Sequence, residues 1–426
     1  MQIHVVKSGD TLWNLSRIYK VSTQAIIEAN GLTDPNYLVR GQALVIPVTG
    51  QYHIVKSGET LYKIAQQYGI SIQTLVQMNN IKNPNNIPLG FRLILPTKSK
   101  PSIYTGSYID PKMTGTRSAK LVEKVGKDLT YLNLFSYQVQ RDGDLTSLDD
   151  GSILNAARQN KVAPLLVLTN LENGQFKTDL ATILFTNEQL QDRVLDQALE
   201  IMQLKGYRGL DVDFEYLGAE NRELYVRFLE KAARRIKPLG YSLSVAVAPK
   251  ISGEQSGVLY EGHDYQGIGK IVDFMFIMTY EWGWSGGKPM AVAPLNQVRR
   301  VISYAVSVVP REKIMMGIPL YGYDWTLPYT PGKWAKSISP QRALELAQTY
   351  NVSIQYDTGV QAPWFRYHDE KGNEHEVWFE DARSIAEKFN LVKEFKLRGF
   401  YYWVLGHEFP QNWLLIEDNF VVKKIV

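Results

Sequence analysis

The sequence predicts an α/β protein in which a (β/α)8 barrel follows two small βααβ modules. We place the modules at residues 1–49 and 50–98 and the barrel at residues 99–426. The first hundred residues contain an internal repeat. From Ile103 onward, apolar strand-like runs alternate with amphipathic helices, and eight such runs within about 325 residues suit a closed barrel. A chain of 426 residues is also too long for one hydrophobic core.

The repeat is visible residue by residue. His4–Leu12 (HVVKSGDTL) matches His53–Leu61 (HIVKSGETL), and the same offset aligns Asn30 with Asn79. A fixed offset kept over so many positions indicates two copies of one unit. In each copy a β-branched run is followed by a turn-and-cap sequence, two short helical patterns and a closing strand. Units this small are more suited to binding than to catalysis.

The barrel elements follow from hydrophobic periodicity. The predicted strands are Ile103–Ile109, Tyr131–Tyr137, Ala163–Thr169, Gly209–Phe214, Ser242–Ala248, Phe274–Tyr280, Lys313–Pro319 and Gly399–Val404. Helical patterns between them include Asn187–Gln203, Glu220–Lys237 and Pro340–Thr349. The long gap before the last strand predicts a small α+β insertion at about residues 322–380, which would wall one side of the cleft.

Composition excludes several classes of function. The net charge of +4 gives no support for nucleic-acid binding, and the absence of cysteine excludes disulfides, thiolate metal sites and a thiol nucleophile. The six histidines show no pairing typical of zinc hydrolases, so we expect neither a metal nor a cofactor. We expect no membrane span, because no apolar run is long enough, and we expect a monomer. Met1–Lys7 reads as a strand and not as a signal peptide, which predicts no export by the usual route.

The central feature is the strand Gly209-Leu-Asp-Val-Asp-Phe-Glu215. Because side chains alternate along a strand, Asp211, Asp213 and Glu215 share one face, about 6–7 Å apart. Leu210, Val212 and Phe214 take the opposite face, which would pack under the outer helices. Carboxylates this close cannot all ionise cheaply, so at least one pKa must rise.

Three interpretations of these acids compete. A solvated acidic edge fits poorly, because the interleaved residues are apolar. A divalent-cation site lacks a further acidic cluster. A glycosidase site fits best, because glycosyl transfer needs a proton donor for the leaving oxygen and a carboxylate near the anomeric carbon.

The two N-terminal units resemble the LysM family, which binds N-acetylglucosamine chains of peptidoglycan and chitin. The resemblance implies a ligand groove between the first strand–helix loop and the loop after the second helix. The corresponding loops are Gly9–Leu12 with Asn30–Leu32, and Gly58–Leu61 with Asn79–Ile81. The implied binding residues are Thr11, Asn30, Thr60 and Asn79. Two weak sites on one chain would gain avidity on a repeating polymer.

Residues 103–426 resemble glycoside hydrolase family 18, the chitinase-like TIM barrels. The resemblance is carried by Leu-Asp-x-Asp-x-Glu at 210–215, Met278-Thr-Tyr-Glu281, the Gly-Ile-Pro-Leu-Tyr-Gly run at 317–322, and Tyr402-Trp403. Two positions depart from the family pattern. Arg208 precedes the acids where the family usually has Asp, and Glu281 replaces an Asp.

The family resemblance implies a retaining, substrate-assisted mechanism. Glu215 would protonate the glycosidic oxygen and later activate water, while the sugar's own acetamido oxygen attacks C1. Asp213 would hold the acetamido N–H with help from Asp211, and Tyr280 would hold the acetamido carbonyl. Further substrate contacts are expected from Trp403, Glu281, Met278 and Tyr321.

At whole-chain level the sequence is similar to the spore cortex-lytic N-acetylglucosaminidases of bacilli. That resemblance implies cleavage of β-1,4 bonds after N-acetylglucosamine in cortex peptidoglycan during germination. It also implies synthesis in the mother cell and a location at the spore cortex or coat. A chitinase, or a catalytically inactive glycan-binding barrel, are the alternatives. The sequence leaves open whether cleavage is endo or exo and whether both modules bind.

Overall fold

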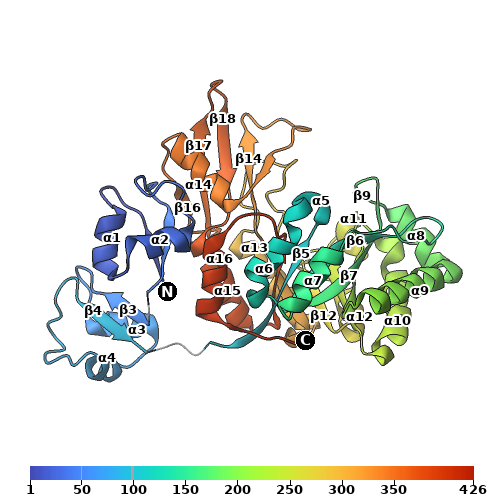
Figure 1. Cartoon of the computed structure of the whole chain (residues 1–426), viewed down its shortest axis with the longest axis horizontal. Coiled ribbons are helices and arrows are strands. Elements are labelled where there is room, and N and C mark those ends of the chain that lie inside the picture. The colour runs from blue at the N-terminus through green and yellow to red at the C-terminus, as the bar shows by residue number, and fades with distance from the viewer. Residues whose placement is uncertain (49, 97–99) are drawn as a thin grey trace.

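The computed structural model describes residues 1–48, 50–96 and 100–426. Figure 1 shows the barrel with an antiparallel insertion above it and the two N-terminal modules at its side. Among the described residues, no helix has the length and apolar character needed to cross a membrane.

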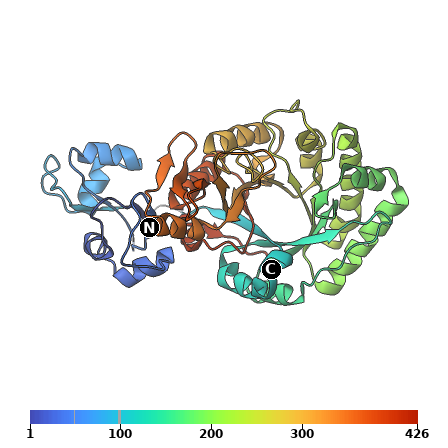
Figure 2. The ribbon, with the colours of Figure 1, turned by 90° about the horizontal axis from the view of Figure 1, so that it is seen from above.

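Eight parallel strands form the barrel and confirm the predicted fold class. In sequence order they are β5 (Ser102–Ile109), β6 (Tyr131–Gln138), β7 (Ala163–Thr169), β10 (Gly209–Asp213), β11 (Ser242–Val247), β12 (Phe274–Ile277), β13 (Ile314–Pro319) and β19 (Gly399–Trp403). Each strand pairs with its neighbour, and β19 closes the barrel on β5 with Gly399 opposite Tyr104. Viewed from above, the helices form a ring outside the strands (Figure 2).

The outer layer is built mainly from helices that follow the strands. They are α6 (Ser118–Val125), α7 (Gly151–Gln159), α8 (Thr178–Thr186), α9 (Glu188–Lys205), α10 (Arg222–Ile236), α12 (Tyr265–Ile271), α13 (Leu295–Val308), α15 (Ala382–Phe395) and α16 (Pro410–Asn419). Short elements complete the domain: α5 (Pro111–Thr114), β8 (Leu171–Glu172), β9 (Gln175–Phe176), α11 (Val258–Glu261) and β20 (Val421–Val422).

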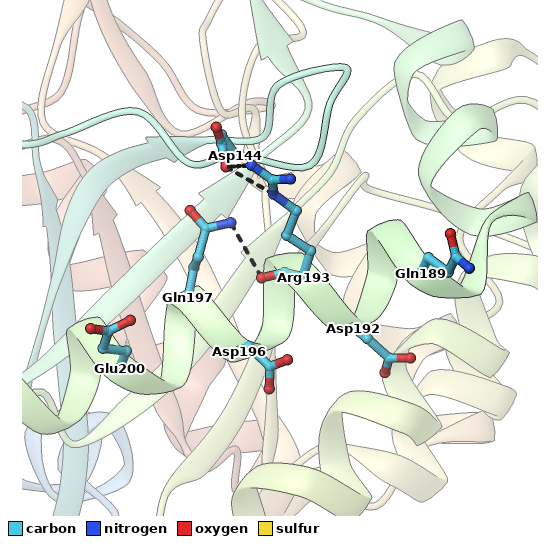
Figure 3. Close-up of a pocket in the computed structure, with 7 residues that line it drawn as sticks. All are labelled: Asp144, Gln189, Asp192, Arg193, Asp196, Gln197 and Glu200. Carbon is cyan, nitrogen blue, oxygen red and sulfur yellow. Dashed lines mark hydrogen bonds and ion pairs between the residues drawn. The ribbon is translucent and has the colours of Figure 1, made fainter.

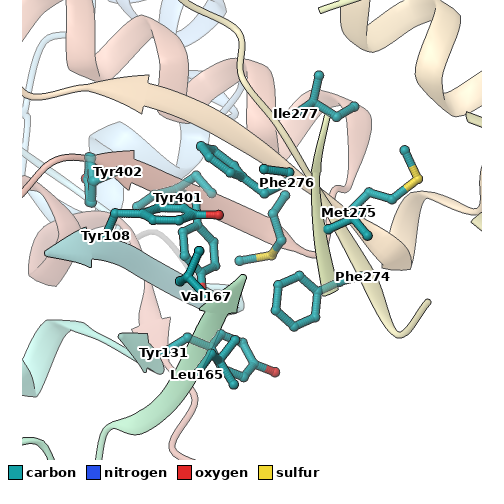
Figure 4. Close-up of a cluster of buried hydrophobic side chains, with 14 of the residues drawn as sticks. Tyr108, Tyr131, Leu165, Val167, Phe274, Met275, Phe276, Ile277, Tyr401 and Tyr402 are labelled. Carbon is teal, nitrogen blue, oxygen red and sulfur yellow. The ribbon is translucent and has the colours of Figure 1, made fainter. Parts of the chain in front are cut away.

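The barrel interior is filled largely by aromatic side chains (Figure 4). Tyr131 lies against Phe274 with ring centroids 4.9 Å apart, and Phe276 lies against Tyr401 at 5.2 Å. Tyr108 joins the same group at 5.4 Å from Phe276. Because a filled barrel is a core and not a pore, a ligand can only be met at its mouth, where the carboxyl ends of the strands lie.

The predicted insertion is a five-stranded antiparallel sheet with one helix. It contains β14 (Gly322–Thr326), β15 (Lys336–Ile338), α14 (Pro340–Thr349), β16 (Gln355–Asp357), β17 (Ala362–His368) and β18 (Glu374–Trp378). The strand order is β15-β14-β18-β17-β16. Trp364 and Trp378 stack on neighbouring strands of this sheet at 5.6 Å.

The N-terminal modules each have the predicted strand–helix–helix–strand order. The first contains β1 (Gln2–Val5), α1 (Leu12–Tyr19), α2 (Thr23–Asn30) and β2 (Ala43–Ile46). The second contains β3 (Gln51–Ile54), α3 (Leu61–Tyr68), α4 (Ile72–Met78) and β4 (Arg92–Leu95). In both modules a threonine, Thr11 or Thr60, caps the first helix with its side-chain oxygen.

Candidate active site

The predicted acids lie along and just beyond β10. Asp211 and Asp213 are within the strand, and Glu215 follows its last residue by two positions. The intervening residues point to the helices: Phe214 is fully buried and stacks near Tyr225 and Phe228 at about 6 Å. This alternation directs the acids to the opposite, inner face.

Asp211 is the deepest acid and is well supplied with donors. The Tyr108 hydroxyl donates to one of its oxygens and the Ser244 hydroxyl to the other, both at 2.5 Å. Burial raises the pKa of Asp211, whereas these hydrogen bonds act to lower it. The Ser244 hydroxyl comes from β11, which pairs with β10, and the Tyr108 hydroxyl comes from β5, three strands away around the barrel, so each oxygen is held from a different strand.

Asp213 has no such support. It is buried, and its Oδ1 atom has no hydrogen-bond partner among the described residues. Burial and the neighbouring charges of Glu215 and Asp211 raise its pKa well above the ordinary value. A buried acceptor without a partner is uncommon and suggests a position that a ligand or proton completes.

Glu215 is half-buried at the mouth, and its pKa is raised to about 7 by burial and by the charge of Glu281. Its main chain is held by Asn170, which immediately follows β7. The Asn170 side chain accepts from the Glu215 N–H at 3.0 Å and donates to the Glu215 carbonyl at 2.9 Å. A carboxyl group that is protonated near neutral pH is suited to act as a general acid.

His263 fixes the residue before Glu215. Its Nδ1 accepts the Ala248 N–H at 3.0 Å, so Nε2 carries the proton and donates to the Phe214 carbonyl at 3.0 Å. Burial lowers the pKa of His263 to about 4, which keeps the ring neutral. The position of Glu215 therefore depends on neutral groups that do not add charge to the site.

A second group of polar residues extends from the end of β12. Tyr280 is buried, and the carboxylate of Glu281, which follows it, accepts hydrogen bonds from Tyr321 and, at 2.9 Å, from Tyr323. Glu281 adopts a left-handed backbone with φ of 68°, a conformation that costs energy in a residue with a side chain. Burial raises the pKa of Tyr280 well above the ordinary value, and Asp213 and Glu215 add to the effect.

Trp403 and Met278 are both half-buried. Trp403 ends β19 and packs on Tyr108 and Phe135, with centroids 5.4 and 5.1 Å away. Because the Tyr108 hydroxyl donates to Asp211, Tyr108 links the Trp403 indole to the acid group. The structure thus brings Asp211, Asp213, Glu215, Tyr280, Glu281, Met278, Tyr321 and Trp403 together at the barrel mouth.

Comparisons with known proteins agree with this geometry. The family model for glycosyl hydrolases family 18 matches residues 105–408, and the model for the LysM domain matches residues 4–47 and 53–96. The chain belongs to glycosyl hydrolase family 18. It is therefore a glycoside hydrolase, and it carries two LysM domains, hereafter LysM1 and LysM2.

Several relatives match over the whole chain. It is 51% identical to a cortical fragment-lytic enzyme of Bacillus subtilis and 46% identical to one of Bacillus cereus, covering 100% of this chain and 99% of each relative. The crystal structure of the Bacillus megaterium spore cortex-lytic enzyme SleL superposes with a TM-score of 0.91 at 44% identity, covering 100% of this chain and 99% of that one.

The residues predicted to bind glycan in the LysM domains need one correction. Asn30 is fully buried: its amide bonds the Ile26 and Val45 carbonyls, and its oxygen accepts the Val45 N–H. The prediction that the Asn30 side chain contacts the glycan is therefore wrong, because this side chain ties α2 to β2. Asn79 makes the same three bonds in LysM2 but is half-buried. Thr11 and Thr60 are exposed helix caps.

Sequence reasoning missed the residues that support the acids. They are Tyr108, Ser244, Asn170, His263 and Tyr323. Asn170 had a visible signal, because a polar residue directly after a barrel strand lies at the catalytic end. The departure at position 208 lies elsewhere: Arg208 is exposed and precedes the first residue of β10, at the end of the strand opposite the mouth.

A separate surface hollow lies along α9 and contains none of the predicted site residues (Figure 3). It is lined by Asp144, Gln189, Asp192, Arg193, Asp196, Gln197 and Glu200. Its charges are partly paired, as in Arg193 with Asp144 and Asp192 with Arg235. Within the part of the chain that the structure describes, no cluster of His, Cys, Asp or Glu side chains is arranged to hold a metal ion.

Proposed function

We propose that this enzyme hydrolyses the β-1,4 bond after N-acetylglucosamine in spore cortex peptidoglycan, by a retaining mechanism that uses the substrate's acetamido group. The observation that carries the proposal is the contrast between two neighbouring acids. Glu215 has a pKa raised to about 7 at the open mouth, while Asp213 beside it holds a buried oxygen without a partner.

Each acid then has a separate task. Protonated Glu215 gives its proton to the glycosidic oxygen, and the C1–oxygen bond breaks. The acetamido carbonyl oxygen attacks C1 and forms an oxazolinium ion, so no enzyme nucleophile is required. Glu215, now ionised, takes a proton from water as the water attacks C1 from the same side that the leaving group left, and configuration is retained.

Asp213 accepts the acetamido N–H through the unpartnered Oδ1 atom. This contact fills the vacant hydrogen bond. The N–H donor and the developing positive charge of the oxazolinium ion both favour ionised Asp213, against the burial that raises its pKa in the free enzyme. Tyr280 holds the acetamido carbonyl, and Trp403 forms the apolar floor under the sugar ring. Glu281, Tyr321 and Met278 complete the walls of the sugar site.

The choice of bond follows from the same chemistry. Muramic lactam in the cortex has no free acetamido group and cannot assist its own cleavage, whereas N-acetylglucosamine can, so we assign the cut to the bond after N-acetylglucosamine. The cortical fragment-lytic names of the full-length relatives favour cortex material over chitin. We also propose that the enzyme acts at the spore cortex and that it is a monomer.

The direct test compares Glu215→Gln with the wild type on isolated cortex. We expect turnover to fall by at least about 100-fold with polymer binding unchanged, since only the proton donor is lost. Mass spectrometry of the wild-type digest should show new reducing ends at N-acetylglucosamine. New ends at muramic acid, or products from chitin only, would contradict the substrate assignment.

Asp213→Asn tests the acetamido contact separately. Asparagine cannot supply the negative charge, so we expect a loss of at least about ten-fold in turnover. Near-wild-type turnover would refute the role of Asp213 while leaving that of Glu215 intact.

A further inference from the structure

The two LysM domains share one fold but not one environment. LysM1 contacts the catalytic domain through a face that we call the docking face, made of residues 29–31 and 39–45. Figure 1 shows α2 of LysM1 next to α16 and β16. The contacts of α2 with α16 and of β2 with α15 hold this face against the barrel and its insertion.

The docking face is tied down by hydrogen bonds. Gln411 donates to the Asn30 side chain at 2.6 Å and to the Ala43 carbonyl at 2.9 Å. Gln341 donates to the Gly31 carbonyl at 2.8 Å. Further bonds join the Arg40 carbonyl to the Ile354 N–H and the Gly41 carbonyl to Arg383.

Two glycines show how tightly the surfaces meet. A Cβ atom on Gly31 would lie 2.8 Å from Pro410, and one on Gly41 would lie 1.9 Å from the Ile354 carbonyl oxygen. At the equivalent positions of LysM2, Asn80 replaces Gly31, and a Cβ on Gly90 would meet nothing within 4 Å. The LysM1 sequence is thus fitted to the barrel surface, and the LysM2 sequence is not.

LysM2 leaves the equivalent face open. Val45 is fully buried, whereas the equivalent Ile94 is 52% exposed; Ala29 is 5% exposed, and the equivalent Met78 is 40%. Every hydrogen bond that joins LysM2 to another unit, among the described residues, goes to LysM1, through Tyr52. The catalytic domain therefore does not cover this face of LysM2.

The open face has a chemistry that suits an N-acetylated sugar chain. Asn80 and Leu89 lie on this face, and Leu89 is 73% exposed. The exposed amides of Asn85 and Asn86 lie in the same loop before β4 and border the face. Amides both donate and accept hydrogen bonds, as sugar hydroxyl and acetamido groups require, and an apolar side chain can pack on the apolar face of a pyranose ring. Among the matching LysM1 positions, Asn36 is the same residue as Asn85, but the other three bond to the catalytic domain. Gly31 and Arg40 do so through their carbonyl groups, and Tyr37 donates to Asn351.

We propose that LysM2 alone supplies the glycan contact on this face, and that LysM1 is the joint that fixes LysM2 to the barrel. The inference rests on the proposed function for the identity of the polymer. It assigns different roles to two repeats that the sequence presents as equals. A glycan bound to LysM2 would lie at a fixed position relative to the barrel mouth. LysM1 is packed against the catalytic domain, and LysM2 is joined to LysM1.

The repeat supplies matched variants for the test. Asn85→Ala with Leu89→Ala removes an amide and an apolar side chain from LysM2. Asn36→Ala with Arg40→Ala changes the equivalent LysM1 positions, and all four residues are exposed, so folding should be unaffected. Each pair is placed in the full-length Glu215→Gln chain, so that the polymer is not cut, and binding to chitin beads and to cortex is measured.

We expect the LysM2 pair to weaken binding by at least about ten-fold and the LysM1 pair by less than about two-fold. An equal loss in both pairs, a larger loss in the LysM1 pair, or no loss in either would overturn the proposal. Turnover of a chromogenic N-acetylglucosaminide by the same pairs with Glu215 intact should match the wild type. If the wild-type enzyme did not hydrolyse this substrate at all, that result would count against the proposed function and not against the role of LysM2.

Discussion

Glu281→Gln should shift the pH dependence of the enzyme toward lower pH. The pKa of Glu215 is raised from its ordinary value of 4.5 to about 7, with burial the larger cause and the charge of Glu281 the second. The general acid must be protonated, so activity falls as the pH rises through that pKa. Removing the charge of Glu281 makes ionised Glu215 less costly, and the fall should begin at a lower pH.

The size of the shift follows from the order of the causes. Because burial outweighs the charge of Glu281, the substitution should recover less than half of the rise, about one pH unit at most, or about 1.4 kcal/mol. Glutamine retains an oxygen that can accept from Tyr321 and Tyr323, so the local geometry should persist.

The assay is the pH profile of kcat/KM on a chromogenic N-acetylglucosaminide, with kcat measured separately. Glu394→Gln is the matched control, since Glu394 forms an exposed ion pair with Arg299 and should leave the profile unchanged. An alkaline limb that stays in place, or that moves to higher pH in Glu281→Gln, would refute the electrostatic coupling between the two carboxyl groups.

Two further predictions concern stability. Gly41→Ala and Gly90→Ala share the cost of a positive φ, about 1–2 kcal/mol, but only Gly41→Ala also meets the Ile354 carbonyl, so it should cost about 1–3 kcal/mol more. Faster hydrogen exchange of the Ile354 amide in Gly41→Ala, and not in Gly90→Ala, would report undocking of LysM1; equal exchange in both would contradict the tight fit. Lys388→Met should destabilise the catalytic domain by about 3–5 kcal/mol in denaturant unfolding, because it leaves the buried carboxylate of Glu380 without its partner at 2.9 Å. Adding Glu380→Gln should restore part of the lost stability. No recovery would show that the loss came from packing and not from an unpaired buried charge.

The barrel was predictable because several of its strands, such as β7 and β12, are nearly continuous apolar runs, and hydrophobic periodicity identifies such runs directly. The boundary at β12 was less accurate. The predicted strand reached Tyr280, but it ends at Ile277, because the Thr279 N–H turns to the Ile277 carbonyl and the Tyr280 N–H to the Met278 carbonyl. Leaving the ladder early is what places Tyr280 across the mouth.

The residues that hold the acids in place were harder to predict, because Tyr108, Asn170 and Ser244 are far apart in sequence. Asn30 illustrates the limit: an asparagine at the end of a short helix is equally typical of a ligand contact and of a buried residue that ties the helix to a strand. Only the position of α16, with Gln411 bonded to Asn30, shows that this one is buried between domains. Local sequence cannot show which surface of a module another domain covers.

Within the acid cluster, the unfavourable electrostatics fall mainly on one group, Asp213. Asp211 has two hydroxyl donors, and Glu281 has two, so hydrogen bonds offset part of the rise in pKa that burial causes at both groups. Asp213 lies between Asp211 and Glu215, receives the repulsion of both, and has an oxygen without a donor. An arginine or lysine at this point would stabilise the fold, but it would also lower the pKa of Glu215 and remove its proton. Holding Glu215 through its main chain, with the neutral side chains of Asn170 and His263, fixes the acid without that penalty. The Oδ1 atom of Asp213, which has no donor among the described residues, can then accept the acetamido N–H of the substrate, and this N–H is a neutral donor.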